Sequence, residues 1–594
     1  MHYFLLLVLA FAAPLAARDV PADWQTLFER SHGRETSDYG ETVAFCRRLA
    51  ATSDWLDYRS FGVSAGGLDM PVLVGGGADP AKPLIFVLAG IHPGEIDGKD
   101  AGLIYLRELV QTDQYRDVRD KLRIAFVPIF NVDGHELRGE FHRINQIGPH
   151  TQGRRTTLWY QDLNRDWLKA DTPEMRAMIA LIDELDPAFL LDIHVTDGAE
   201  YDYVISWGLN TAANELPAVR GYSRDVYLPS IQKRMAKRGY DFAPYALFQE
   251  GPDAASGWVR PVWEPRFSTG FGGVLGRPFL LIETHSRKPF PERVEATRVF
   301  FEETLALFAA QPQVLLDMAR TADRQAESLA DSLRAAQSAW PFDLELTGDS
   351  VMVGFKGRQE HKRWSEFAGD SILTWSSEPW TRQIPLYEQA RVTHSAVPPL
   401  GYVIPRPWWI KVRDVIQAHG LPALELDTAV TITVETYLFD SVTFAATPYE
   451  SHFRTTAHIA KTERQQWRLP QGSVLIPLNH RKALRVLNLL EPDGPDSFVQ
   501  WGFLPSIFEQ KEGGDADILD TLAQSMVRAR PELMEEFQRK LASDTAFARS
   551  PDDRLNYWYK QSVYWDERTN RYPIGRIVDK DSFRRAVQAC GIQL

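Results

Sequence analysis

Three short apolar runs in the first half of the chain each lead to residues that bind metals or carry protons. The runs span residues 83–90, 188–193 and 278–282, and each is rich in Leu, Ile, Phe or Val. Continuous apolar runs of this length are typical of interior strands, which are buried on both faces of a sheet. The residues they lead to are His92 and Glu95 for the first run, His194 for the second and Glu283 for the third.

In open α/β sheets, functional groups collect at the carboxyl ends of the strands, so we expect these four side chains to meet. Two His and one Glu are the protein ligands of a catalytic zinc ion whose fourth position stays open for water. A further Glu is what such a site needs as its general base. The pattern therefore predicts a catalytic zinc site built from strand ends.

Length and charge limit the class of protein. At 594 residues the chain is too long for one hydrophobic core, so two or three domains are expected. The formal net charge of −13 argues against nucleic acid and against an anionic membrane surface as partners. Beyond the N-terminus, no segment approaches the roughly 18 apolar residues of a transmembrane helix, so we expect no membrane span. The sequence does not indicate an oligomeric state.

The N-terminus has the layout of a cleavable signal peptide. Residues 3–13 form an uninterrupted apolar run that is too short to span a bilayer, and polar sequence begins at Arg18. Small residues precede that point, which favours cleavage after Ala17. We therefore predict an exported protein, periplasmic or secreted.

Strand and helix patterns alternate through the first half of the chain, which predicts an α/β fold with a mixed twisted sheet flanked by helices. The expected helices are residues 39–50, 99–110, 173–185 and a long helical stretch over 291–336. The expected strands before the second apolar run are residues 71–74, 84–88 and 122–127.

The second half of the chain predicts a separate α+β region. Residues 351–355, 430–436 and 442–445 alternate like half-exposed antiparallel strands, and the last hundred residues are mainly helical. We expect the domains to be a signal peptide (1–17), a catalytic domain (18–312), a helix followed by a β-rich extension (313–450) and a mainly helical C-terminal region (451–594).

The order of the motifs resembles that of a known enzyme family. His92-x-x-Glu95, the run Asp162-Leu163-Asn164-Arg165-Asp166-Trp167, then His194 and Glu283 together resemble the zinc metallocarboxypeptidases, the carboxypeptidase A-like family. The resemblance covers roughly residues 38–307, and the rest of the chain is similar to the long C-terminal extension of some bacterial relatives. It implies a zinc carboxypeptidase-like fold for the catalytic domain.

The resemblance also implies roles for single residues. His92, Glu95 and His194 would hold one zinc ion per chain, and Glu283 would pass a proton from water to the leaving amine. Arg155 would stabilise the oxyanion, although its neighbour Arg154 is an alternative.

Substrate contacts follow from the same resemblance. Asn164 and Arg165 would bind the free C-terminal carboxylate of a peptide, because guanidinium meets carboxylate in a bidentate fork. Asp162 would orient a zinc-bound imidazole, and Arg143 is a further candidate for substrate contact. Phe271 stands where related sequences have a Tyr, so it can pack on substrate but cannot donate a hydrogen bond.

Three functions are consistent with these features. The first is an exported zinc carboxypeptidase that releases C-terminal residues from peptides. The second is a zinc amidohydrolase acting on a non-standard amide, such as a cell-wall peptide or an N-acyl amino acid. The third is a zinc-stabilised binding protein with reduced turnover. An intact Glu283 argues against the third, and the presence of both Asn164 and Arg165 favours the first.

Overall fold

The structure is a computed structural model that describes residues 20–592. The predicted signal peptide, with its cleavage after Ala17, lies outside the described residues. The chain divides into two compact units: unit 1 is Met1–Ala326 with Asp343–Thr393, and unit 2 is Glu327–Phe342 with His394–Leu594. Among the described residues, no helix has both the length and the apolar character needed to cross a bilayer.

Unit 1 is built on an eight-stranded sheet with the order β1-β2-β4-β3-β5-β10-β6-β7. Its neighbouring strands β4, β3, β5 and β10 run parallel, whereas β1, β2 and β6 pair antiparallel, so the predicted mixed sheet is confirmed. The strands are β1 (Leu56–Val63), β2 (Asp69–Gly75), β3 (Leu84–Ala89), β4 (Arg123–Val127), β5 (Phe189–Val195), β6 (Ile205–Gly208), β7 (Ala243–Pro244) and β10 (Phe279–Thr284).

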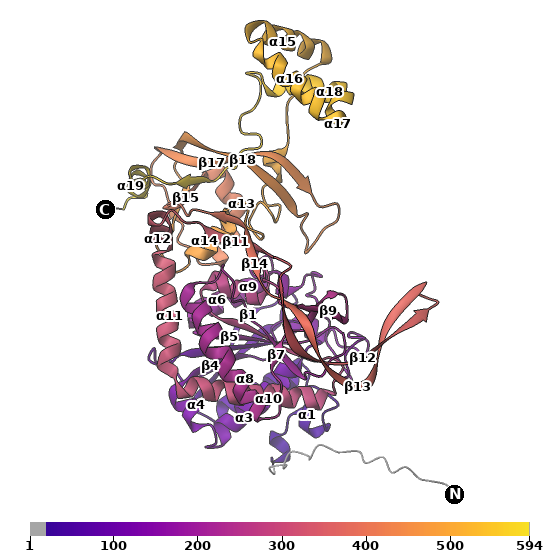
Figure 1. The fold of residues 1–594 in the computed structure, drawn as a ribbon. Helices are drawn as coiled ribbons and strands as arrows, with labels where there is room; N and C mark the ends of the chain where they lie inside the picture. The colour runs from indigo at the N-terminus through magenta and orange to yellow at the C-terminus, as the bar shows by residue number, and fades with distance from the viewer. Residues whose placement is uncertain (1–19, 593–594) are drawn as a thin grey trace. The chain divides into compact units, whose positions relative to one another are not determined.

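Helices cover both faces of this sheet, as expected for strands that are buried throughout. Figure 1 shows α3, α8 and α10 together on one side and α6 and α9 on the other. The main helices are α2 (Tyr39–Ala51), α3 (Asp97–Gln111), α6 (Pro173–Leu185), α8 (Leu228–Lys237), α9 (Ser268–Leu275), α10 (Phe290–Ala310) and α11 (Pro312–Glu327). Side-chain caps define where several helices begin. For example, Thr172 accepts a hydrogen bond from the Met175 amide, directly before Pro173 begins α6.

The predicted long helix over residues 291–336 is in fact three helices, α10, α11 and α12 (Leu329–Ala335). Gln311 leaves the helical conformation, with φ −141° and ψ 54°, because the ring of Pro312 disfavours a helical residue before it. Pro312 then begins α11, a position where its missing N–H costs no hydrogen bond.

A long hairpin joins unit 1 from far along the sequence. Strands β12 (Ser350–Ser365) and β13 (Asp370–Tyr387) form it, and β13 pairs with β9 (Asp253–Val259), which pairs with β8 (Leu247–Glu250). The predicted boundary at residue 312 therefore differs from the observed division, since both α11 and this hairpin belong to unit 1. Strands β11 (Trp340–Leu346) and β14 (Ala390–Ala396) form a separate two-stranded sheet.

Unit 2 contains a six-stranded antiparallel sheet with the order β16-β19-β15-β20-β17-β18. The predicted strands 430–436 and 442–445 are one strand, β17, because a bulge near Leu438 lets the chain continue its pairing with β18. The strands are β15 (Gly401–Ile404), β16 (Leu424–Glu425), β17 (Val430–Phe444), β18 (Thr455–Leu469), β19 (Val474–Pro477) and β20 (Gly575–Ile577).

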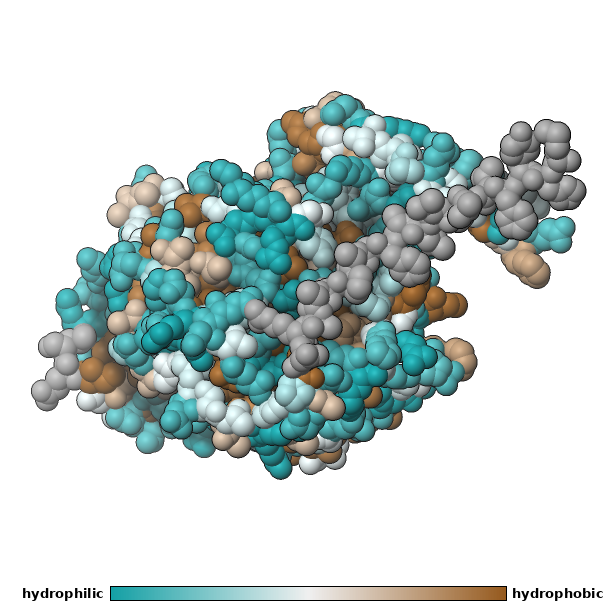
Figure 2. Space-filling model, turned by 90° about the horizontal axis from the view of Figure 1, so that it is seen from below, coloured by the Kyte–Doolittle hydropathy of each residue, from teal (hydrophilic) through white to brown (hydrophobic). Residues whose placement is uncertain are grey.

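The helices of unit 2 fall into two groups. Three accompany the sheet: α13 (Arg406–Ala418), α14 (Ala483–Leu490) and α19 (Lys580–Ala589). Four more lie between residues 516 and 560 and share a small core that includes Phe537, Phe547 and Trp558. They are α15 (Ala516–Ala529), α16 (Glu532–Ser543), α17 (Thr545–Arg549) and α18 (Pro551–Lys560). The face of the molecule in Figure 2 is predominantly hydrophilic, with hydrophobic residues in small groups.

Candidate metal and catalytic site

The carboxyl ends of three adjacent strands bring the four predicted residues together. His92 and Glu95 lie in the loop after β3, and His194 and Glu283 are direct Cα partners in the parallel register of β5 and β10. Ligand atoms of His92, Glu95 and His194 all lie within 4.8 Å of one another. All four side chains are buried.

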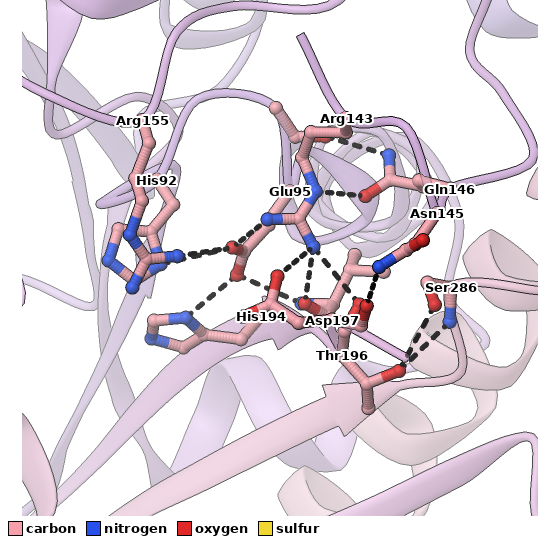
Figure 3. A network of polar contacts seen from close by, with 12 residues as sticks. His92, Glu95, Arg143, Asn145, Gln146, Arg155, His194, Thr196, Asp197 and Ser286 are labelled. Atoms are coloured by element: carbon pink, nitrogen blue, oxygen red, sulfur yellow. Dashed lines mark hydrogen bonds and ion pairs between the residues drawn. The ribbon is translucent and has the colours of Figure 1, made fainter. Parts of the chain in front are cut away.

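Each imidazole turns the same ring nitrogen toward the shared carboxylate. The Nδ1 atom of His92 is 3.1 Å from Glu95 Oε1, and the Nδ1 atom of His194 is 2.9 Å from Glu95 Oε2. Figure 3 shows the two rings near the Glu95 carboxylate, with Arg143 reaching the same group. This cluster fits a metal site, because two imidazoles and one carboxylate, the protein ligands of a catalytic zinc ion, meet at one point.

A second carboxylate faces the outer nitrogen of each ring. Asp162 Oδ1 lies 2.9 Å from His92 Nε2 and is hydrogen-bonded to it, at the position that the sequence predicts for an orienting carboxylate. Asp192 Oδ2 lies 2.8 Å from His194 Nε2 as an ion-pair contact. Such carboxylates favour a proton on Nε2, which leaves the Nδ1 lone pair for a metal.

The sequence analysis missed Asp192. It stands two residues before His194 on β5, and the period of two along a strand places both side chains on the same face of the sheet. An acidic residue in an otherwise apolar run, two positions from a candidate ligand, is the signal that would have identified it.

The charged groups around the cluster shift the pKa values of two of its members in opposite directions. Burial acts to raise the pKa of Glu95, but the nearby Arg143 and His92 outweigh it and hold that pKa well below its usual range. Burial acts to lower the pKa of His194, but Asp192 and Glu95 outweigh it and raise that pKa well above its usual range. The ionised carboxylate of Glu95 is the form that can bind a metal ion.

Buried atoms without hydrogen bonds support the same interpretation. Glu283 Oε2 is buried and makes no hydrogen bond to a described residue, and His92 Nδ1 is buried and makes none either, although it has an ion-pair contact with Glu95 at 3.1 Å. A buried polar atom without a partner is costly, so it indicates a missing ligand or ion. The donor set, two imidazoles and one carboxylate, fits zinc with an open fourth position.

Glu283 lies beside the cluster in an environment that favours its protonated form. Burial raises the pKa of Glu283 well above its usual range; His194 opposes this effect, whereas Glu95 and Asp197 add to it. A carboxyl whose pKa lies above its usual range can hold a proton for longer, which suits a group that receives a proton and then delivers it.

The structure separates the candidate arginines. Arg154 is exposed, whereas Arg155 lies at the cluster, with Nη1 3.2 Å from Glu95 Oε1 and Nη2 3.0 Å from Asp162 Oδ2. About a third of the Arg155 side chain remains exposed, at 36%. Of the two neighbouring arginines, Arg155 is therefore the one that reaches the cluster, and its guanidinium is still partly accessible.

All three guanidinium nitrogens of Arg143 donate hydrogen bonds to other residues. It donates to Glu95 Oε1 at 2.5 Å, to Gln146 Oε1 at 2.7 Å and to the carbonyl oxygens of Val195 and Thr196 at 2.9 and 3.0 Å. These bonds hold the Glu95 carboxylate in place (Figure 3). The contacts favour a positioning role over the substrate contact that the sequence suggested.

Asn164 and Arg165 lie next to each other but differ in what they contact. The Asn164 Oδ1 atom accepts hydrogen bonds from the Ser268 amide at 2.9 Å and from Trp167 Nε1 at 3.2 Å, which ties its side chain to α9. The Arg165 guanidinium stacks 4.2 Å from the centre of the Phe267 ring, donates to the Asn164 carbonyl at 2.7 Å and lies 3.8 Å from Asp162 Oδ2. Arg165 thus keeps donors for an incoming anion.

Phe271 is the one predicted substrate contact that the structure places in the core. Its side chain is fully buried in α9 and stacks on Trp167, with ring centres 5.2 Å apart. The expected contact with substrate is therefore corrected, because the ring has no exposed surface. The alternating small residues around it, from Gly270 to Gly273, let α9 pack close to its neighbours.

Tyr245 is a second residue that the sequence analysis missed. Burial, and then the negative charges of Glu283, Asp197 and Glu95, raise the pKa of its phenol well above the usual range. These influences place the phenol in the field of the catalytic carboxylates, between β7 and β8. A Tyr in a loop upstream of Glu283 was the available signal, because its hydroxyl can donate a hydrogen bond that Phe cannot.

Comparisons with known proteins indicate a class of protein. Residues 42–203 match the sequence family described as zinc carboxypeptidase. The chain is 23% identical over 498 residues to Carboxypeptidase 2 of Trichophyton rubrum, which covers 80% of this chain and 86% of that protein. It is 22% identical over 496 residues to Carboxypeptidase 2 of Trichophyton tonsurans, with the same shares covered.

Solved structures of metallo-carboxypeptidases are also similar to this chain. A metallo-carboxypeptidase from Pseudomonas aeruginosa, in complex with (2-guanidinoethylmercapto)succinic acid, has 17% identity and a TM-score of 0.37, covering 47% of this chain and 70% of that one. A metallo-carboxypeptidase from Burkholderia cenocepacia has 15% identity and a TM-score of 0.36, covering 46% and 70%.

The match over residues 42–203 confirms the resemblance to the zinc carboxypeptidases noted from the motifs. The chain is a hydrolase of the peptidase class.

Proposed function

We propose that this protein is an exported, zinc-dependent metallocarboxypeptidase that hydrolyses the C-terminal amide bond of peptides. The observation that supports this most directly is the meeting of His92, Glu95 and His194 beside Glu283 at adjacent strand ends. The apolar N-terminal run supports export. The family match supports the peptidase class, and the site geometry supports the assignment of roles.

His92 and His194, through Nδ1, and Glu95 would hold one zinc ion. Bound zinc supplies Lewis acidity and lowers the pKa of a bound water from 15.7 to about 7. The buried surroundings of the cluster keep bulk water out, which strengthens every charge interaction inside it. Arg143 fixes the carboxylate of Glu95 in the orientation that the ligand set requires.

The remaining residues act on the substrate. Glu283 would accept a proton from water at its carboxylate and deliver it to the nitrogen of the leaving amine. Arg155, partly exposed beside the cluster, would stabilise the negative charge that develops on the carbonyl oxygen. Tyr245 would donate a hydrogen bond to the substrate backbone.

Arg165 would select the end of the peptide. Its free donors suit a carboxylate, and its stacking on Phe267 holds the guanidinium in one plane. Asn164 would support this contact by fixing the start of α9. An enzyme that depends on this contact trims peptide ends and does not cut internal bonds.

The test compares peptides that differ only at the C-terminus. An amidated end leaves Arg165 without its ionic partner, and breaking such a pair costs roughly 2–5 kcal/mol. We expect kcat/KM to fall by about 30-fold or more on amidation, at about 1.4 kcal/mol per factor of ten. Equal cleavage of both peptides by the zinc-loaded protein would contradict the carboxypeptidase function and would favour the amidohydrolase alternative.

A further inference from the structure

Unit 2 contains a cavity that plays no part in the peptidase site. It has a volume of about 510 Å³, within the range of small-molecule sites. Its walls come from four separate segments: the start of α13, the end of β18, the chain after Leu504 and the loop before β20. Convergence of distant segments on one cavity is typical of a binding site.

Two tryptophans line this cavity. Trp408 lies in the first turn of α13, and Trp467 lies near the end of β18, and both side chains are partly exposed. The Trp467 indole donates from Nε1 to Gln465 Oε1 at 3.0 Å, which fixes the orientation of the ring. Large aromatic side chains that stay accessible in a concave site are common anchors for ligands.

The charged residues of the lining balance one another. Three acids (Glu509, Asp566, Glu567) and three bases (Lys511, Arg568, Arg571) line the cavity. Each base already has an ionic partner: Lys511 pairs with Glu509, Arg568 with Asp566 at 2.6 Å, and Arg571 with Glu463 at 2.7 Å. No net charge is therefore left to select an ionic ligand, although donors and acceptors are plentiful.

We propose that this cavity binds a neutral saccharide. One face of a pyranose ring presents C–H groups, which suit the electron-rich face of an indole ring. Its edge presents hydroxyl groups that both donate and accept hydrogen bonds, which suits a lining of paired carboxylate, guanidinium, ammonium and amide groups. The site lies within unit 2, and its function does not rest on the proposed peptidase activity.

Calorimetric titration of the full chain with neutral oligosaccharides tests this proposal. The probes are cellohexaose, xylohexaose and the hexamer of N-acetylglucosamine, with a proline-rich decapeptide as the competing class of ligand. We expect at least one saccharide to bind and to protect tryptophan fluorescence from acrylamide quenching. Absence of binding by all three saccharides, or binding of the peptide alone, would overturn the proposal.

Substitutions of the two cavity tryptophans test whether the saccharide binds in this cavity. Trp408→Ala should weaken saccharide binding at least about tenfold, because a stacked ring contributes both contact area and ring-specific attraction. Trp467→Phe keeps a ring at the second position and should weaken binding by a smaller factor. Trp364→Ala is the matched control, since Trp364 is 61% exposed on the hairpin of unit 1.

Unchanged affinity in both cavity variants, or an equal loss in the Trp364 control, would contradict the assignment. Thermal unfolding of each variant shows whether it is folded. If Trp408→Ala does not fold, the Trp467→Phe variant and the quenching protection of the unmodified chain decide the question. Neither readout depends on peptide hydrolysis, so failure of the saccharide site and failure of the peptidase function are distinguishable.

Discussion

Both units bury charged side chains, but they satisfy them in different ways. In unit 1, His92 Nδ1 and Glu283 Oε2 are buried and make no hydrogen bond to a described residue. In unit 2, the buried Glu491 carboxylate accepts hydrogen bonds from Tyr402, from Tyr437 at 2.8 Å and from Arg576 at 2.9 Å. Arg576 in turn pairs with Glu435 at 3.0 Å.

The difference separates a site of chemistry from a structural network. A fully hydrogen-bonded buried network stabilises one arrangement of the core and leaves no position for a ligand. Buried atoms without partners raise the free energy of the unliganded state, and a metal ion or substrate relieves that cost. The comparison therefore predicts that substitutions in unit 1 change binding and catalysis, whereas substitutions at Glu491 change stability.

The largest effect is expected from removing a metal ligand. His92→Ala or His194→Ala leaves two protein ligands, so the purified variant should lose both zinc and activity, where the unmodified chain carries about one zinc ion. Metal analysis of the dialysed protein measures this. His458→Ala is the matched control, because His458 is largely exposed in unit 2. Full zinc content in a variant that carries both substitutions would exclude this site.

The network in unit 2 should give the next largest effect. Glu491→Leu removes one of the two carboxylates that pair with the buried Arg576 guanidinium, and breaking a buried pair costs about 3–5 kcal/mol. Chemical denaturation should show a lower free energy of unfolding, whereas the zinc content stays at about one ion per chain. A variant as stable as the unmodified protein would mean that the network is not structural.

Removing the proposed base should lower turnover without removing metal. Glu283→Gln keeps the size of the side chain but cannot accept a proton, so kcat should fall at least about 10²-fold. The matched control is Glu41→Gln, at a surface ion pair on α2, which should leave kcat unchanged. If Glu283→Gln stays active, another group is the base.

The contact between Arg165 and the C-terminal carboxylate of the peptide should raise kcat/KM about 30-fold. Arg165→Met keeps the length of the side chain but removes the cation, so free and amidated peptides should be cleaved with similar kcat/KM. The control is Arg154→Met, at the exposed arginine that precedes Arg155. This variant should keep the full discrimination between free and amidated peptides. Discrimination that survives in Arg165→Met would assign carboxylate binding to a different residue.

The last effect concerns the outer carboxylates, and its expected range begins at the smallest value of the series. Asp192→Asn weakens the field that orients His194, and such changes typically lower metal affinity about 10–100-fold. Competition with a coloured chelator measures the zinc dissociation constant directly. Asp162→Asn should have a similar effect through His92. If the zinc dissociation constant is unchanged in both variants, the carboxylates do not affect metal affinity.

The candidate site could be predicted from the sequence where it depends on strand ends. Apolar runs report buried strands, and residues at their carboxyl ends meet in any parallel sheet, so His92, His194 and Glu283 were identifiable by position. Asp192 and Tyr245 were missed for different reasons. Asp192 lies inside an apolar run, and Tyr245 lies in a segment whose path depends on pairing with distant strands.

The sequence by itself determined the alternation of strands and helices in unit 1 and the residues at its strand ends, because burial and periodicity are local properties of the chain. Only the tertiary structure decided that Phe271 is buried on Trp167, that Arg143 holds Glu95, and that the hairpin of β12 and β13 belongs to unit 1. These facts depend on contacts between residues far apart in the sequence, which no local pattern encodes.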